Sequence, residues 1–172
     1  TLVETAASRP GGVGIDLAGG PTPGHDWSLE NYAPAFRRAK ELGLGRTVHA
    51  GEGRPPGEIR AAIELLHAQR IGHGTTLLQD PSVLELVLAR GVTIEACPTS
   101  NWHVGAIPAV KAHPLPRWLT LGVRACICAD NTLLSQTDAP TELERAAAMP
   151  GMTPALLADA VRYGHEAAFP RR

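Results

Sequence analysis

The sequence has no excess of charge of either sign. Its 172 residues include 16 Lys and Arg against 17 Asp and Glu, which gives a formal net charge of -1. Proteins that bind nucleic acid usually carry a marked basic excess on the surface that faces the phosphates. The composition therefore argues against a nucleic-acid partner.

Long apolar runs and a leader segment are also missing. The longest apolar runs, such as residues 125–129, are far shorter than the ~20 residues that a membrane-spanning helix needs. The first residues, Thr1 to Thr5, show neither the basic region nor the apolar region of a secretory signal. We therefore expect no membrane association and a cytoplasmic location.

Cysteines and aromatic residues are scarce. The 3 cysteines, Cys97, Cys126 and Cys128, are an odd number without the spacing of a disulfide scaffold, which agrees with a reducing compartment. Aromatic residues make up only 4% of the chain, so the core must consist mainly of Leu, Val, Ile and Ala. A hydrophobic fraction of 44% is that of an ordinary globular protein and excludes wholesale disorder.

Short apolar runs alternate with amphipathic stretches along the chain. Strands are expected over residues 13–17, 46–49, 70–73, 92–97 and 124–129. Helices are expected over residues 29–42, 57–69, 80–91, 116–121, 141–148 and 153–168. Strands that alternate with helices at this pitch indicate βα units and a parallel sheet with helices on both faces. The predicted fold class is therefore α/β.

A polar or thiol side chain stands where each expected strand ends. These residues are Asp16, His49, His73, Cys97 and Asp130. The carboxyl ends of parallel strands meet at one edge of the sheet, and that edge is the active-site face of α/β folds. We therefore expect these side chains to lie close together.

Two histidines are the first candidates for chemistry. The segment after His49 allows a sharp turn that would bring Glu52 into the same pocket, within reach of a metal-bound water or a substrate. The alternative is a turn with a solvent-facing Glu52 and a hydrogen-bonded histidine. His73 stands between Gly72 and Gly74, which admit close approach by backbone or ligand. A structural histidine in a tight turn is the alternative there.

Asp130 and the cysteines leave further alternatives open. A carboxylate directly after a buried strand is costly unless it is paired, caps a helix or binds a metal, and Asp130 could do any of these. Cys126 and Cys128 share strand parity with Asp130, so a thiolate metal site is conceivable, although free cysteines more often act as small buried hydrophobes. Cys97 could be a nucleophile, but no cysteine-enzyme signature accompanies it. The other histidines are expected in loops or on helix surfaces: His25, His67, His103, His113 and His165.

Five segments taken together resemble the adenosine deaminase family of metal-dependent hydrolases. They are GIDLAG at 14–19, TVHAGE at 47–52, RIGHG at 70–74, EACPTSN at 95–101 and ADN at 129–131. Their order and spacing match the family over nearly the whole chain. The resemblance implies a (β/α)8 TIM barrel with zinc at the carboxyl ends of its strands. Residues 1–172 would be its carboxyl-terminal portion, approximately strands four to eight with their helices.

The resemblance also implies a reaction. It would be zinc-dependent hydrolytic deamination of a purine nucleoside, adenosine or deoxyadenosine to inosine or deoxyinosine, with metal-bound hydroxide attacking C6. One Zn²⁺ per complete active site would be held in part by His49 and Asp130. His73 and Asp130 would orient and deprotonate the water, and Glu52 would protonate ring N1.

Two further residues would bind the purine by the same resemblance. The backbone amide of Gly19 would bind N3, and Asn131 would donate to N7 where the family often has a second aspartate. Gly20 replaces the acidic residue that commonly follows the motif glycine. The exact purine therefore stays open, with adenine or a modified purine as the alternative substrate.

One element of the family has no counterpart in the sequence. The family takes two more zinc ligands from a His-x-His pair at the end of its first strand, whereas no two of the 7 histidines here stand two positions apart. A zinc site normally needs at least three protein ligands. The chain is thus expected to lack strands one to three. The alternative to an active enzyme is a catalytically incomplete fragment or interaction subunit, whose partner would be a complementary amino-terminal half or a second copy.

Overall fold

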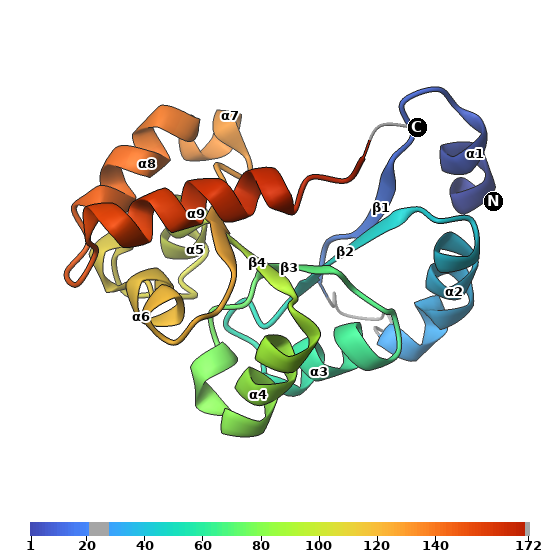
Figure 1. Ribbon diagram of the computed structural model, residues 1–172, viewed down its shortest axis with the longest axis horizontal. Helices are drawn as coiled ribbons and strands as arrows, with labels where there is room; N and C mark the ends of the chain where they lie inside the picture. The colour runs from blue at the N-terminus through green and yellow to red at the C-terminus, as the bar shows by residue number, and fades with distance from the viewer. Residues whose placement is uncertain (21–27, 171–172) are drawn as a thin grey trace.

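A five-stranded parallel sheet forms the centre of the molecule, with the strand order β1-β2-β3-β4-β5 (Figure 1). The computed structural model describes residues 1–20 and 28–170. The strands are β1 (Gly14–Leu17), β2 (Gly45–Ala50), β3 (Arg70–His73), β4 (Thr93–Ala96) and β5 (Ala125–Ile127). Every neighbouring pair is parallel, which confirms the α/β class and all of the expected strands.

Helices connect the strands in the expected alternation (Figure 1). The longer ones are α2 (Ala33–Glu41), α3 (Gly57–Glu64), α4 (Pro81–Arg90), α8 (Ala139–Ala147) and α9 (Pro154–Glu166). The shorter ones are α1 (Leu2–Ser8), α5 (Pro98–His103), α6 (Leu115–Thr120) and α7 (Thr132–Ser135), with 3₁₀ turns at Leu29–Tyr32, Leu77–Gln79 and Val110–Ala112. Helices α1, α5 and α7 were not expected, because they are too short to show a helical period in the sequence. No helix in the described part of the chain has the length and apolar character to cross a membrane.

The helix expected over residues 29–42 is divided in two. Leu29–Tyr32 forms a 3₁₀ turn, and α2 starts only at Ala33. Pro34 lies in the first turn of α2. Its ring lacks an N–H and would clash with the carbonyl four residues earlier, so a continuous α-helix cannot pass through it. Ser28, at the N-cap position of the 3₁₀ turn, makes no capping hydrogen bond.

Two other helix ends show how local signals succeed or fail. Helix α4 is capped at both ends by residue types that favour caps, with Asp80 accepting from a backbone N–H of the first turn and Gly91 in the left-handed region at the end. Helix α3 stops at Glu64 instead of continuing to residue 69. His67 there has a φ of 52°, which is incompatible with a right-handed helix.

The strands alternate between an apolar face and a polar face. The apolar face packs into the main core and carries Ile15, Leu17, Val48, Ile71 and Ile94. The residues that alternate with these are small or polar, including Asp16, Thr47, His49, Gly72 and Glu95. The polar face therefore offers side chains for a site, while the apolar face holds the helices.

The segment after α9 returns across the sheet towards β1 (Figure 1). An ideal Cβ at Gly45 would lie 2.2 Å from the ring of Phe169, and one at Gly14 would lie 2.7 Å from it. The guanidinium of Arg70 lies over this ring, 3.8 Å from its centroid. The ring thus ties the end of the chain to the amino-terminal ends of β1, β2 and β3.

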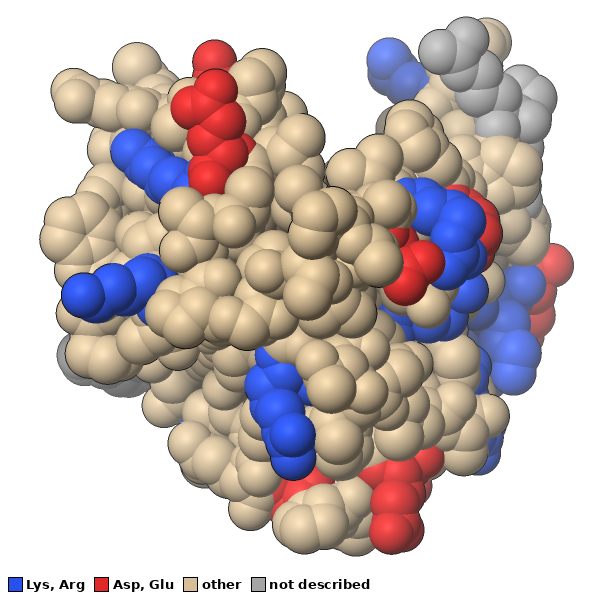
Figure 2. All heavy atoms as spheres, turned by 60° about the vertical axis from the view of Figure 1, so that its left-hand side comes forward, with Lys and Arg blue, Asp and Glu red and all other residues tan. Residues whose placement is uncertain are grey.

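Charged side chains of both signs are mixed on the surface. Figure 2 shows Lys and Arg interspersed with Asp and Glu over the described residues of one face. Several of them form exposed pairs, such as Arg38 with Glu4 at 2.7 Å and Arg162 with Asp159 at 2.6 Å. On this face the charges do not form the continuous basic surface that phosphate backbones require.

Replacing Gly45 by Ala should destabilise the fold, because the new methyl would overlap the Phe169 ring. The expected loss in the free energy of unfolding is about 1–3 kcal/mol, the usual cost of overpacking. Urea unfolding checks it. The matched control is Gly57→Ala at the start of α3, where nothing lies within 4 Å of the added Cβ. A Gly45→Ala protein as stable as the control would show that the ring does not occupy this position.

Candidate active site

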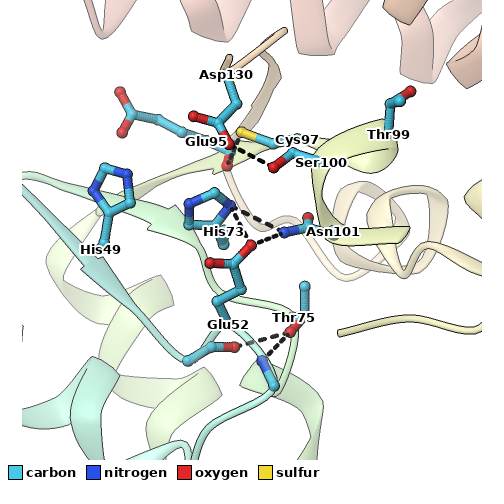
Figure 3. A network of polar contacts seen from close by, with 12 residues as sticks. His49, Glu52, His73, Thr75, Glu95, Cys97, Thr99, Ser100, Asn101 and Asp130 are labelled. Atoms are coloured by element: carbon cyan, nitrogen blue, oxygen red, sulfur yellow. Dashed lines mark hydrogen bonds and ion pairs between the residues drawn. The ribbon is translucent and has the colours of Figure 1, made fainter. Parts of the chain in front are cut away.

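Side chains from three strand ends converge at one edge of the sheet (Figure 3). His49 belongs to β2, His73 ends β3, Asp130 follows β5, and Glu52 lies on the loop after β2. The rings of His49 and His73 meet edge to face with their centroids 4.8 Å apart. An oxygen of Glu52, Oε1, lies 3.3 Å from Nδ1 of His73. The expectation that these residues lie together is confirmed.

The loop after β2 is held in a fixed turn that aims Glu52 at His73. Gly51 has a φ of 67°, and a Cβ there would lie 2.7 Å from Ile59, so only glycine fits. The hydroxyl of Thr75 donates to the Gly51 carbonyl and accepts from the Gly53 N–H, both at 2.9 Å. Glu52 therefore points inward, and the alternative of a solvent-facing turn is wrong.

His73 and Asp130 both have left-handed backbone conformations, with φ of 70° and 55°. Such a conformation costs a residue with a Cβ about 1–3 kcal/mol and persists where the surrounding structure demands it, often at functional sites. Here it turns each side chain out of the strand direction at the last position of β3 and just after β5. Two separate strand ends thus carry strain at the residues predicted to be catalytic.

His49 is oriented by the carboxylate of Asp16, which lies one residue before the end of β1. The two groups are 3.2 Å apart, Nδ1 to Oδ1. This hydrogen bond raises the pKa of His49 above its ordinary value, against the opposing effect of burial. With Nδ1 committed to Asp16, Nε2 is the nitrogen left for a metal, and a carboxylate behind a ligating histidine is the usual arrangement in metal sites.

His73 is buried, and its environment favours the neutral imidazole. Burial lowers the pKa of His73, while the nearby carboxylate of Glu52 acts in the opposite direction. The side chain keeps only 3% of its surface exposed. His73 is therefore an uncharged ring at neutral pH, able to donate from one nitrogen and accept at the other.

The sequence left helix capping and a role in the site open for Asp130. In the structure, the two neighbouring residues Asp130 and Asn131 each take one of these roles. Asn131, not Asp130, caps helix α7, because its Oδ1 accepts from the Leu134 N–H at 2.8 Å. Asp130 instead accepts a hydrogen bond of 2.5 Å from the hydroxyl of Ser100. The capping alternative for Asp130 is thus wrong. The cap leaves the amide NH₂ of Asn131 as a donor for another partner.

Two residues of the site were missed by sequence reasoning, Asn101 and His113. Asn101 is fully buried on α5 and contacts both Glu52, at 2.7 Å, and His73, at 3.0 Å. His113 was expected at the surface, yet it is 3% exposed and lies 3.3 Å from Oδ1 of Asn101. Asn101 ends one of the motif segments, so a signal existed for it, whereas nothing local marks His113.

The remaining histidines that the structure describes are exposed or partly buried. His103 and His165 are exposed, as expected, and His67 is partly buried in a turn. His25 lies outside the described residues.

The cysteines pack together next to the site, and among the described residues they belong to no group of three side chains placed to hold a metal ion. The sulfurs of Cys126 and Cys128 are 3.8 Å apart, which confirms their shared parity. A hydrogen bond to Cys128 and burial raise the pKa of the Cys97 thiol, so Cys97 is not an activated nucleophile. All three thiols are free.

A cavity of about 140 Å³ opens beside Glu52. It is lined by Gly19, Gly20, His49, Ala50, Glu52, Arg54 and Glu58. Gly19 has a φ of 97°, and nothing lies within 4 Å of the place where its Cβ would stand. A ligand can therefore approach its backbone closely. Arg54 on the wall is neutralised by Glu58, whose Oε1 lies 2.5 Å from Nε.

The residues present account for part of a zinc site. His49 and Asp130 are ligand types that zinc accepts, and the Asp16 contact orients the imidazole suitably. Over residues 1–20 and 28–170, however, no group of three His, Cys, Asp or Glu side chains is placed to hold a metal ion. A complete zinc site thus needs a ligand from outside these residues.

Comparison with known proteins agrees with this geometry. A family model described as adenosine deaminase matches residues 1–171. The chain belongs to the adenosine deaminase family. Among curated relatives, the adenosine deaminase of Serratia proteamaculans is 36% identical over 163 residues, which cover 95% of this chain and 48% of the relative. The adenine deaminase of Rhizobium leguminosarum is 35% identical and covered to 50% of its length.

A solved structure places the fold among TIM-barrel deaminases and amidohydrolases. An amidohydrolase from Burkholderia ambifaria, determined with bound Zn, has a TM-score of 0.84 and 25% sequence identity. The match covers 98% of this chain and 47% of that chain. The chain thus spans about half the length of the relatives it matches. Its open sheet corresponds to part of a closed barrel, as expected from the sequence.

Acid should destabilise the deaminase-family fold through His113. Burial lowers the pKa of this histidine to about 3, against 6.5 for an ordinary one, so only the unfolded chain binds its proton between these values. The stabilisation is complete above pH 6.5 and is lost as the pH falls, at up to about 1.4 kcal/mol per pH unit.

Urea unfolding between about pH 7.5 and about pH 5 measures this loss. A His113→Gln variant should lose stability less steeply than the wild type over this range. The exposed His103→Gln variant should keep the wild-type slope. Equal slopes for His113→Gln and wild type would contradict a neutral, buried His113.

Proposed function

We propose that this chain supplies the proton-transferring half of a purine deaminase active site. The observation that carries the proposal is the cluster at the strand ends, where a carboxyl oxygen of Glu52 lies 3.3 Å from His73 and Asp130 follows β5. Two carboxylates and two imidazoles gathered at one edge of the sheet, of which Glu52 and His49 line the adjoining cavity, are the groups that hydrolytic deamination needs as acids, bases and ligands.

His49 and Asp130 are the proposed zinc ligands of this chain. The support is their ligand chemistry and the Asp16 contact that frees Nε2 of His49. Zinc would supply the Lewis acidity that makes water a nucleophile near neutral pH. The Zn-containing Burkholderia ambifaria relative supports a metal of this kind.

Each proton in the reaction has a proposed carrier. Asp130, oriented by Ser100, takes a proton from the attacking water with His73 beside it, and the resulting hydroxide adds to C6 of the purine. Glu52 delivers its proton to ring N1, which makes C6 a better acceptor. The proton on Asp130 leaves with ammonia, the hydroxyl proton restores Glu52, and the product is the 6-oxopurine.

The proposed substrate is a purine nucleoside, adenosine or deoxyadenosine. Nothing lies within 4 Å of the place of a Cβ at Gly19, so a purine can approach the Gly19 amide that would bind N3. The helix cap uses only Oδ1 of Asn131 and leaves its NH₂ for N7. Adenine is the second candidate, because a relative of nearly equal identity is an adenine deaminase. Arg54 is the one Lys or Arg among the described residues that line the cavity, and its pairing with Glu58 leaves no unpaired guanidinium there for an anionic ligand, which suits an uncharged one.

We also propose that activity needs strands beyond this chain. The support is the incomplete ligand set and the coverage of only about half of each relative. The partner would be an amino-terminal half or, less economically, a second copy of the chain. The alternative is that the chain is an interaction subunit that takes no part in catalysis. Three free thiols fit a cytoplasmic setting for the assembled protein.

Complementation tests the proposal directly. The chain alone, with Zn²⁺ added, should bind zinc weakly and deaminate adenosine slowly or not at all. Adding the portion of the Serratia proteamaculans enzyme that lies outside the matched region should restore ammonia release and inosine formation. Rapid turnover by the monomeric chain alone would overturn the need for a partner. Absence of turnover despite a stable complex that binds zinc would overturn the proposed reaction.

Exchanging Glu52 for Gln in the complemented protein should reduce kcat by about 10²–10⁴-fold, the usual contribution of a general acid. Glutamine keeps the size and the acceptor oxygen for Asn101 but carries no transferable proton. The matched control is Glu85→Gln on the exposed face of α4, which should leave kcat unchanged. Unchanged turnover in Glu52→Gln would remove this residue from the mechanism.

A further inference from the structure

A buried hydrogen-bond chain outside the cavity leads to the catalytic pair. Its first member is His113, whose Nδ1 accepts from the Leu115 N–H at 3.0 Å. A buried neutral imidazole that accepts at Nδ1 carries its proton on Nε2. That nitrogen lies 3.3 Å from Oδ1 of Asn101, so His113 donates to the amide oxygen.

The contact from His113 settles which way the Asn101 amide points. Because Oδ1 accepts from His113, Nδ2 must be the atom on the other side, facing Glu52 at 2.7 Å and His73 at 3.0 Å. An amide NH₂ has two protons, and here each one has its own acceptor (Figure 3). The Asn101 side chain is fully buried, so water does not compete for these bonds.

The donor from Asn101 then determines the tautomer of His73. Since Nδ2 of Asn101 donates to Nδ1 of His73, that nitrogen cannot carry a proton of its own. We propose that Asn101, oriented by His113, is a positioning residue that fixes His73 as the Nε2–H tautomer and holds the Glu52 carboxyl beside it. The catalytic consequence of this assignment rests on the proposed deaminase function.

The tautomer separates the roles of His73 and Asp130. In Figure 3 the second ring nitrogen of His73 points away from Asn101, towards the side of the site where His49 lies. A proton on that nitrogen makes His73 a hydrogen-bond donor to the attacking oxygen and leaves Asp130 as the base. Without Asn101, the nearest partner of His73 Nδ1 is the Glu52 oxygen at 3.3 Å, and a carboxylate there favours a proton on Nδ1 instead.

The direct test is the tautomer itself, read from long-range ¹H–¹⁵N NMR spectra of the metal-free chain with ¹⁵N-labelled histidine near pH 8. His73 signals are assigned by their loss in His73→Asn. The wild type should show Nε2–H in about tenfold excess, the ratio that one hydrogen bond sustains. A wild-type His73 with its proton on Nδ1 overturns the proposal, whatever any variant does.

Variants separate positioning from a purely structural role. Asn101→Leu and Asn101→Asp both remove the donor and should shift His73 to the Nδ1–H form, although only Leu also removes the polar side chain. His113→Phe should give a mixture of the two His73 tautomers, because the Asn101 amide can then rotate by 180° and exchange its oxygen and nitrogen. His103→Gln, on the same helix, should leave the tautomer unchanged. Amide dispersion in the same spectra verifies folding, and folded Asn101 variants that keep Nε2–H contradict the assignment.

Activity in the complemented protein supplies a second, independent readout. Asn101→Asp should lower kcat by about 10- to 100-fold with a smaller effect on KM, as losses of supporting hydrogen bonds commonly do. If His73 has the expected tautomer but the complemented protein does not deaminate, the result counts against the proposed function and leaves the role of Asn101 in positioning His73 standing. Deamination with an unchanged kcat in Asn101→Asp would count against Asn101 alone.

Discussion

The carboxylate of Glu142 has no exposed surface, and the helix that organises the site depends on it. It accepts hydrogen bonds from the backbone N–H and the hydroxyl of Thr99 at the start of α5, and Arg145 pairs with it at 3.1 Å. A buried charge is tolerated only with such partners. The next residues of α5, Ser100 and Asn101, hold the proposed base and the proposed proton donor. A charge outside the cavity thus sets the position of the groups within it.

The same edge of the sheet carries the proposed proton-transfer groups and only part of the proposed zinc ligand set. Parallel strands bring His49, His73 and Asp130 to one end, and strained backbone at two of them turns the side chains inward. In the proposed reaction the proton-transferring groups all lie in this chain. The proposed zinc shell is different, because the described residues offer no group of three ligands and the chain spans about half of each relative. In this proposal metal binding is therefore shared between this chain and a second segment of the barrel.

Part of this site could be read from the sequence, since the rule that carboxyl ends of parallel strands form the active face needs only strand order. His49, His73 and Asp130 were predicted in that way. Asn101 and His113 could not be given their roles, because these depend on contacts between residues far apart in the chain, 49 positions for Asn101 and Glu52. The break of the first long helix at Pro34 was readable from the sequence but was outweighed by the apolar period around it.

In the proposed enzyme, this chain contributes two ligands to a zinc ion shared with a second segment, and it contributes the acid that protonates the purine. The most direct measurement is a crystal structure of the complemented protein with zinc and a purine inhibitor, with the metal located by anomalous diffraction. We expect His49 and Asp130 in the zinc shell and the Glu52 carboxyl within hydrogen-bond distance of ring N1. A zinc ion bound without His49 and Asp130, or a purine with N1 turned away from Glu52, would contradict it.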